Sequence, residues 1–201
     1  GNGYALAAAF GHKILEPVPS TVALVVKDPC CHFLQGQKVR AKVTSCIGGK
    51  PVRTTSGELL FTQYGLSGTA ILDVSDEISI AVNRDHAKDV SVIVDLIPFM
   101  SESALVEELS RRFERGVSRQ NLLEGLLAHK FFSAFRTAIQ NTDASSIVHG
   151  LKNKEFMVAG TRGWNEAEFT AGGVSAEEVE SLTLESKLQP RLHFAGEILD
   201  V

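Results

Sequence analysis

Short segments rich in β-branched residues, with partly alternating apolar and polar positions, fill most of the first half of the chain. Such segments are typical of strands that bury one face, and residues that favour turns separate them. The predicted strands cover residues 20–28, 37–47, 50–62, 77–83 and 89–97. The predicted turns lie at Gly48-Gly49, Ser56-Gly57 and Asn83 to Asp85. The pattern predicts an antiparallel β-barrel or sandwich over residues 17–98.

Two short helices are predicted beside these strands. Residues 1–10 are mostly small and apolar, and Gly11 follows at the position where helices commonly end. Because this segment is apolar on all sides, it should be buried on more than one face. A second, short helix is predicted to follow two glycine turns, in a stretch where apolar residues recur at helical spacing. These apolar residues are Leu66, Ala70, Ile71 and Val74, and the glycines are Gly65 and Gly68.

A small helical subdomain is predicted over residues 99–152. Its first helix places Leu105, Leu109 and Phe113 four residues apart, with Ser101 as N-cap and Gly116 at the end. Apolar stripes then continue through "RQNLLEGLLAHKFFSAFRTAI" and "SSIVHGLKN". Charges of both signs are mixed along these helices, which favours a solvated outer face over a partner site.

Strands and glycines return in residues 153–201, where candidate binding chemistry also gathers. The "TAGGV" stretch, residues 170–174, has consecutive glycines that would let a flat ligand approach the backbone closely. A buried strand predicted over residues 192–195 leads to Gly196, Glu197 and Asp200, whose carboxylates can accept hydrogen bonds from ligand hydroxyls. Each stretch also fits an ordinary turn, and the residues alone do not separate the two interpretations.

The composition narrows the class of protein. The chain has 201 residues, of which 44% are hydrophobic, and a formal net charge of -4. No apolar run approaches the ~20 residues of a membrane span, and the first residues lack a secretory layout, so a cytoplasmic protein without a membrane partner is expected. Because lysines and arginines form no cluster or stripe, a nucleic-acid partner is not expected either.

The sequence offers little support for metal, thiol or common hydrolase chemistry. Cys30, Cys31 and His32 are adjacent, whereas zinc ligands are usually two to four residues apart, so a structural or incidental cluster is favoured and no metal site is predicted. With Cys46 the cysteines number three, which fits a reducing compartment better than a disulfide framework. "GNGYAL" fails as a dinucleotide fingerprint because Leu6 takes the place of the third glycine.

Five stretches, taken together, resemble a known family. They are "GNGYALAAAFGH", "GELLFTQYGLSGTAILDVS", "GTRGWNEAEFTAGGV", "TLESKL" and "LHFAGEILDV". The chain resembles the bacterial NAD(P)/FAD-dependent oxidoreductase family that includes the aminoacetone-oxidase-like and BaiN-type flavoproteins. The resemblance covers essentially the whole chain, with the motifs in the expected order. It implies an α+β chain in which an inserted barrel and a small helical subdomain are flanked by fragments of a Rossmann-like FAD-binding domain.

The resemblance also divides the chain and names candidate cofactor contacts. Residues 1–16 would be a helix of the FAD domain, 17–98 the barrel, 99–152 the helical subdomain, 153–169 the returning strands and 170–201 a second piece of the FAD domain. Thr170, Gly172 and Gly173 match the segment near the flavin ring, and Gly196, Glu197 and Asp200 match the turn near the ribityl or pyrophosphate part of FAD. Gln63 and Thr69 depart from the family, where His and Pro are common.

Two functions remain open at this stage. The resemblance implies the inserted, substrate-covering domain of a flavin-dependent oxidoreductase, with the remainder of the FAD-binding domain as its partner and a small molecule as substrate. Because the fingerprint that holds the pyrophosphate is missing, the chain alone should lack FAD and activity. The alternative is a non-enzymatic β-barrel that binds a ligand or a protein. The two ends are expected to pack on each other, pair with another copy or fray.

Overall fold

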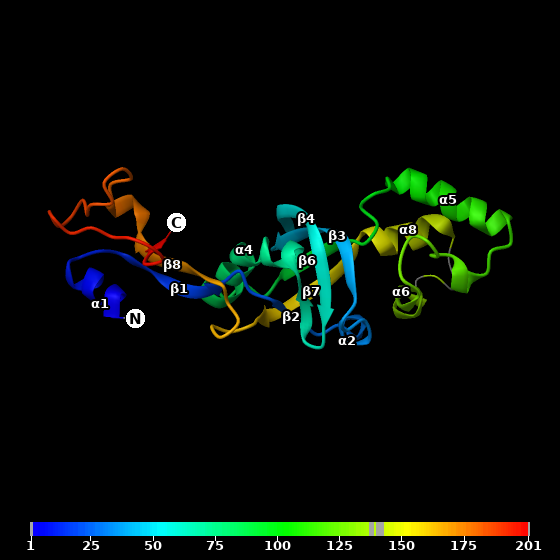
Figure 1. Ribbon diagram of the computed structural model, residues 1–201, viewed down its shortest axis with the longest axis horizontal. Coiled ribbons are helices and arrows are strands. Elements are labelled where there is room, and N and C mark those ends of the chain that lie inside the picture. Colours follow the sequence, from blue (N-terminus) through cyan, green and yellow to red (C-terminus); the bar gives the residue numbers. More distant parts are fainter. Residues whose placement is uncertain (1, 137–138, 140–142, 201) are drawn as a thin grey trace.

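The computed structural model describes residues 2–136, 139 and 143–200. Its parts follow one another along the long axis of Figure 1: a helical unit at one end, a barrel in the middle, and a small sheet that carries both chain ends. Within the described residues, no helix is long and apolar enough to cross a membrane.

The barrel predicted for the first half of the chain is confirmed. Its strands are antiparallel and follow the order β2-β5-β4-β3-β6-β7 around a closed barrel. They are β2 (Leu24–Val26), β3 (Lys38–Ile47), β4 (Lys50–Thr62), β5 (Gly65–Ser67), β6 (Val90–Asp95) and β7 (Lys154–Thr161). Gly48 and Gly49 join β3 to β4 with φ angles of 59° and 71°, which two-residue hairpin turns favour.

Three predictions in this region were wrong. The hairpin turn expected at Asn83 to Asp85 is absent, because Asn83 and Arg84 belong to a π-helical turn. Residues 77–83 were expected to form a strand but belong to the helix α4 (Ser75–Ser79) and the π-helical turn η1 (Ile80–Arg84). Of their apolar residues, Ile78, Ala81 and Val82 pack on the barrel core, as one side of a helical segment does. The Ser56-Gly57 turn is also absent, because both residues lie within the long strand β4. The helix predicted after Gly68 is confirmed as α3 (Thr69–Leu72).

The helical unit follows β6. It contains α5 (Glu102–Glu114), the short turn η2 (Arg119–Asn121), α6 (His129–Ala134) and α8 (Ala144–Lys152). As predicted, Ser101 caps α5 by accepting a hydrogen bond from the Ala104 amide at 3.2 Å. The long apolar stripe after Arg119 is broken into η2 and α6 rather than forming one helix. A short helix, α2 (Pro29–Phe33), lies earlier in the chain, between β2 and β3.

The barrel and the helical unit share one continuous hydrophobic core. Phe61 of β4 is fully buried and packs edge-to-face on Phe131 of α6, with ring centroids 5.7 Å apart, and on Phe156 of β7, at 6.2 Å. Lys152 of α8 adds a polar link, since its ammonium donates to Asp95 Oδ2 at 2.7 Å and to the Ile97 carbonyl at 2.8 Å. The helices are therefore fixed to the barrel by packing and by a partly buried ion pair.

A second, smaller core lies at the opposite end of the molecule. The helix α1 (Asn2–Ala9) packs beside a sheet with the order β1-β8-β9, formed by β1 (Ile14–Ser20), β8 (Phe169–Ser175) and β9 (Leu199–Asp200). β1 and β8 are antiparallel, whereas β8 and β9 are parallel. A short turn, η3 (Ala176–Glu178), follows β8. The buried residues of this core are Ala7, Val174, Val179, Phe194 and Leu199.

The chain ends only partly match their predictions. Residues 192–195 were expected to form a buried strand, but they make a single bridge, between His193 and Glu185, and only Phe194 among them is buried. α1 was expected to be buried on more than one face, yet Ala7 is its only buried residue and Leu6 is 58% exposed. The two ends do pack on each other, because Tyr4 donates a hydrogen bond to the Glu197 carbonyl at 3.3 Å.

His12 links the two chain segments of this end unit. Its Nε2 lies 2.7 Å from Ser186 Oγ, and its Nδ1 lies 3.2 Å from Glu178 Oε2 but is poorly aligned for a hydrogen bond. Ser186 Oγ also accepts the amide hydrogens of Leu188 at 3.0 Å and Gln189 at 2.8 Å. Because both of its lone pairs are then used, Ser186 is poorly suited to act as a nucleophile. This Ser-His-Glu set is a structural link rather than a hydrolase triad.

Polar side chains on α4 and η1 hold the barrel against the end unit. Residues spaced four apart along these two turns bind the strands that run between the barrel and the small sheet. The contacts are Ser75 Oγ with the Val22 amide, Ser79 Oγ with the Pro19 carbonyl, and Asn83 Nδ2 with Thr161 Oγ1. On the neighbouring face, Arg84 donates to the Glu16 carbonyl at 2.9 Å and to the Ala171 carbonyl at 3.2 Å. The guanidinium therefore bridges β1 and β8.

Candidate functional site

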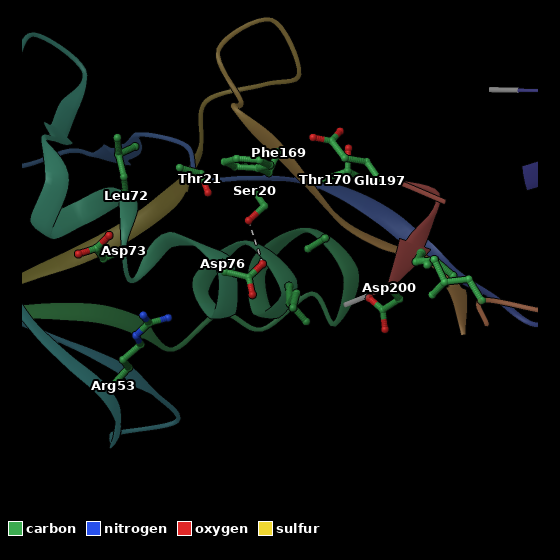
Figure 2. A pocket seen from close by; sticks show the side chains of 15 residues that line it. Ser20, Thr21, Arg53, Leu72, Asp73, Asp76, Phe169, Thr170, Glu197 and Asp200 are labelled. Atoms are coloured by element: carbon green, nitrogen blue, oxygen red, sulfur yellow. Dashed lines mark hydrogen bonds between the residues drawn. The ribbon is translucent and has the colours of Figure 1, made fainter. Parts of the chain in front are cut away.

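A cleft of about 880 Å³ lies where the barrel meets the end unit. Figure 2 shows α4 on one side of it, with Asp76, and the β1–β8 pair on the other, with Ser20 and Phe169. The lining residues come from six separate parts of the chain. They are Ser20, Thr21, Arg53, Leu72, Asp73, Asp76, Ile80, Phe169, Thr170, Ala171, Leu184, Gly196, Glu197, Leu199 and Asp200.

Four of the residues predicted to contact the cofactor line this cleft: Thr170, Gly196, Glu197 and Asp200. Thr170 lies on β8 and Asp200 on β9, so the parallel pairing of these strands brings the two predicted segments together. Gly196 has a φ of 78°, and a Cβ placed on it would meet no atom within 4 Å. This glycine is therefore required by its backbone conformation and leaves open space beside it.

Gly172 and Gly173, also predicted to lie near the flavin, do not line the cleft. A Cβ on Gly172 would lie 2.5 Å from Arg84 Nη2 and 2.6 Å from the Glu16 carbonyl oxygen. A Cβ on Gly173 would lie 3.0 Å from the Ile198 carbonyl carbon. Both residues also have positive φ, 102° and 131°. Their lack of a side chain thus lets β8 pack closely between its neighbours, and their contact with a flavin stays a prediction.

The charge of the cleft is predominantly negative. Its lining holds the carboxylates of Asp73, Asp76, Glu197 and Asp200, whereas Arg53 is the only lysine or arginine among its described residues. In the described part of the chain, the carboxylates of Glu197 and Asp200 accept no hydrogen bond, so both can serve as acceptors for a bound molecule.

The carboxylates of Asp73 and Asp76 are partly engaged by neighbouring hydroxyls. Ser20 Oγ donates to Asp76 Oδ1 at 2.9 Å, which connects β1 to α4 across the cleft (Figure 2). Thr55 Oγ1 donates to Asp73 Oδ2 at 3.2 Å. Apolar side chains from both sides of the cleft accompany these groups: Leu72, Ile80 and Phe169. The cleft can therefore take a molecule that combines hydrogen-bond donors with a flat or apolar part.

The sequence analysis did not identify the barrel side of this cleft. Asp76 belongs to a segment next to the wrongly predicted strand, and its partner Ser20 is 56 residues away. Arg53 lies in the middle of a strand with no local motif around it. The four-residue spacing of Asp76 and Ile80 would have placed both on one helical face, but only if residues 77–83 had been recognised as helical.

Cys30 and Cys31 lie on α2. Asp28 caps this helix by accepting the Cys30 amide hydrogen at 2.8 Å and pairs with Lys154 Nζ at 2.7 Å. No group of three potential metal ligands occurs among residues 2–136, 139 and 143–200. Burial, with the nearby Asp28 carboxylate adding to it, raises the pKa of Cys30 to about 12. Burial likewise raises the pKa of Cys31 to about 12.

We expect these thiols to be nearly inert near pH 9. An unfolded thiol with a pKa of 9.0 is half ionised at that pH, whereas a thiol with a pKa of about 12 is on the order of one part in a thousand thiolate. Because the folded thiols hold their protons to higher pH, their contribution to stability is complete below pH 9 and is lost as the pH rises toward 12. The reactivity of the two thiols is measured by iodoacetamide labelling at pH 9 followed by mass spectrometry, with the urea-unfolded chain as the rapidly labelled control. Rapid labelling of Cys31 in the folded chain would contradict the expectation.

Comparison with known proteins gives a consistent picture. The model of the HI0933-like protein barrel and H2TH domain matches residues 18–169. A 3-dehydro-bile acid delta(4,6)-reductase of Clostridium scindens is 30% identical over all of this chain and 52% of its own length. Ribosomal RNA dihydrouridine synthases of Haemophilus influenzae and Escherichia coli are 26% and 28% identical over 99% of this chain and about half of their own lengths, 49% and 50%. The chain thus spans about half the length of the curated relatives it matches.

Proposed function

Because this chain belongs to the family of the HI0933-like barrel and H2TH domain, we propose that it is the inserted, substrate-covering part of a flavin-dependent oxidoreductase. Its working partner in this proposal is the remainder of the FAD-binding domain, and the chain alone is inactive. The relatives' reductase and synthase names support redox chemistry for the complete protein.

The observation that carries the proposal is the convergence of two separate segments on one cleft. Thr170 comes from β8, and Gly196, Glu197 and Asp200 come from the last six described residues, yet all four border the same space. The opposite wall is supplied by the barrel, through Leu72 and its neighbours on α3 and α4. A cofactor on the first wall and a substrate against the second would therefore face each other.

The residues present fit part of FAD. The free carboxylates of Glu197 and Asp200 suit the hydroxyls of a ribityl chain, and the open space beside Gly196 allows close approach. A diphosphate needs several N–H donors or cations, and Arg53 is the one cation in the described lining. The phosphates would therefore be held by the rest of the FAD-binding domain. When bound, the flavin supplies hydride-transfer chemistry, while these side chains bind and orient it.

The test is the visible spectrum of the complete protein. We expect flavin absorbance after purification or reconstitution with FAD, and none from the 201-residue chain alone. Asp200→Asn should weaken FAD binding on the order of tenfold, because one charge-assisted hydrogen bond becomes a neutral one. Asp85→Asn, a change at an exposed carboxylate outside the cleft, is the matched control. A complete protein that never binds FAD would reject the proposal.

For the substrate we propose a small molecule rather than a nucleic acid. The apolar side chains of Leu72, Ile80 and Phe169 in the lining suit an apolar ring system better than a phosphate backbone, and the acidic lining would repel phosphates. Residues 99–152 hold seven Lys and Arg against six Asp and Glu, so the helices offer no strong positive field.

A ribosomal RNA substrate is the second candidate, because two of the relatives carry that name. Two assays separate the candidates. A strain lacking the complete protein is checked by mass spectrometry for lost dihydrouridine in its ribosomal RNA, and the purified protein is assayed for reduction of an unsaturated 3-dehydro-bile acid. Loss of dihydrouridine would favour RNA. If calorimetry showed that the isolated chain binds either candidate substrate tightly, the alternative of a non-enzymatic binding barrel would be favoured instead.

A further inference from the structure

Two side chains of the cleft are held in a backbone conformation that does not suit them. Among the described residues, those other than glycine with positive φ are Thr21, His86, Leu184 and Arg191, at 47°, 55°, 57° and 69°. Thr21 and Leu184 line the cleft, although 163 positions separate them in the sequence. Histidine tolerates this region comparatively well, whereas a β-branched residue such as threonine is a genuine outlier there. Such strain commonly persists at functional sites.

The fold itself makes no use of the Thr21 side chain. The peptide group that follows Thr21 is fixed at both of its polar atoms: the Val22 amide donates to Ser75 Oγ at 2.9 Å, and the Thr21 carbonyl accepts the Glu168 amide hydrogen at 3.3 Å. Glycine would make the same backbone bonds without strain. Within the described part of the chain, the Thr21 hydroxyl has no hydrogen-bond partner, whereas the adjacent Ser20 hydroxyl is bound to Asp76. Figure 2 shows Thr21 beside Ser20 and Phe169 at the wall of the cleft.

Leu184, in the segment between η3 and β9, likewise has a positive φ that does not suit its side chain. Its amide donates to the Glu180 carbonyl at 2.8 Å, and its carbonyl accepts the Phe194 amide hydrogen at 2.9 Å, so the backbone is again fixed by contacts that any residue could make. The leucine side chain remains 39% exposed over the cleft. An apolar side chain kept in a strained conformation at an open surface gains little from the fold itself.

We propose that Thr21 and Leu184 contact the substrate and determine its specificity. This inference rests on the proposed function, because it takes the cleft to be the active site. The Thr21 hydroxyl is free to bind an uncharged polar atom, such as a ketone or hydroxyl oxygen, and Leu184 adds to the apolar lining that Phe169 and Ile80 provide. An anionic group is disfavoured at this point by the cleft's carboxylates. The substrate class is thus an apolar ring system that enters the cleft by an uncharged oxygen.

The four strained positions provide matched variants. In the complete protein, Thr21→Gly and Leu184→Gly alter the cleft, whereas His86→Gly and Arg191→Gly relieve the same strain outside it. Removing strain should leave the melting temperature unchanged or raise it by roughly 2 °C. The probe is a 3-dehydro-bile acid unsaturated at positions 4 and 6, and its Kd is measured by calorimetry. We expect about tenfold weaker binding for the two cleft variants and less than about twofold change for the two controls.

Two conservative variants refine the test. Thr21→Ser keeps the hydroxyl and should bind the probe within about threefold of the wild type, and Leu184→Asn tolerates positive φ but should bind as weakly as Leu184→Gly. Unchanged probe binding in Thr21→Gly and Leu184→Gly would overturn the inference, as would failure of the wild type to bind the probe. These outcomes do not depend on flavin. A complete protein without flavin absorbance rejects the oxidoreductase proposal, while the calorimetric comparison still decides the roles of Thr21 and Leu184.

Discussion

Gly173→Ala should destabilise the chain by roughly 2–5 kcal/mol, even though it adds a single methyl group. The new Cβ would lie 3.0 Å from the Ile198 carbonyl carbon and closer still to its oxygen, at a φ of 131° that alanine rarely adopts. The parallel pairing of Val174 with Leu199 would then have to open. Urea unfolding followed by circular dichroism measures the loss.

Gly163→Ala is the matched control for this change. A Cβ placed on Gly163 would meet no atom within 4 Å, and the φ of this residue is not positive, so its substitution should alter stability by less than about 0.5 kcal/mol. Equal stability of the Gly173 and Gly163 variants would mean that β8 is not packed against β9 as described. If Gly173→Ala lowered only cofactor affinity and left the unfolding midpoint unchanged, Gly173 would serve the flavin rather than the sheet.

Phe61→Ala should lower the free energy of unfolding by about 3–5 kcal/mol. The side chain is fully buried where β4 meets α6 and β7, so its removal leaves a cavity shared by the barrel and the helical unit. Both parts should therefore lose stability together. Far-ultraviolet circular dichroism should show one unfolding transition, and hydrogen exchange should show the same loss of protection for amides of the barrel and of the helices.

The control for Phe61 is Phe99→Ala. Phe99 is 64% exposed, so its truncation should change stability by less than about 1 kcal/mol. An outcome in which Phe61→Ala unfolds the helices while barrel amides keep wild-type protection would show that the two units do not share a core.

Strong local patterns made much of the fold predictable. The barrel strands β3, β4 and β6 combine β-branched residues with a glycine turn, and α5 has both a serine cap and a closing glycine. The failures occurred where tertiary packing decides the outcome. Residues 77–83 alternate like a strand, yet Ser79 and Asn83 must lie on one helical face to bind β1 and β7, contacts that no local pattern contains.

The candidate site was predictable on one side only. Gly196, Glu197 and Asp200 sit in a recognisable glycine and carboxylate motif, and Thr170 opens a glycine-rich stretch; the resemblance to a flavoprotein family added their assignment to parts of FAD. The other wall arises from long-range contacts such as that of Ser20 with Asp76. Strain at Thr21 is likewise invisible in sequence, because a backbone angle depends on what holds the residues on either side.

Ser20 and Phe169 are direct cross-strand partners at the end of the β1–β8 pair. The chain therefore leaves the small sheet for the barrel after Ser20 and re-enters the sheet at Phe169. Residues 21–168 thus form an insertion whose two ends lie side by side. An insertion of this kind can change in length, or be replaced by another, without shifting β1 and β8, because these two strands are already spaced like the strands of a hairpin. Substitutions in the barrel can thus change which substrates the cleft binds, while the sheet of β1, β8 and β9 keeps its structure.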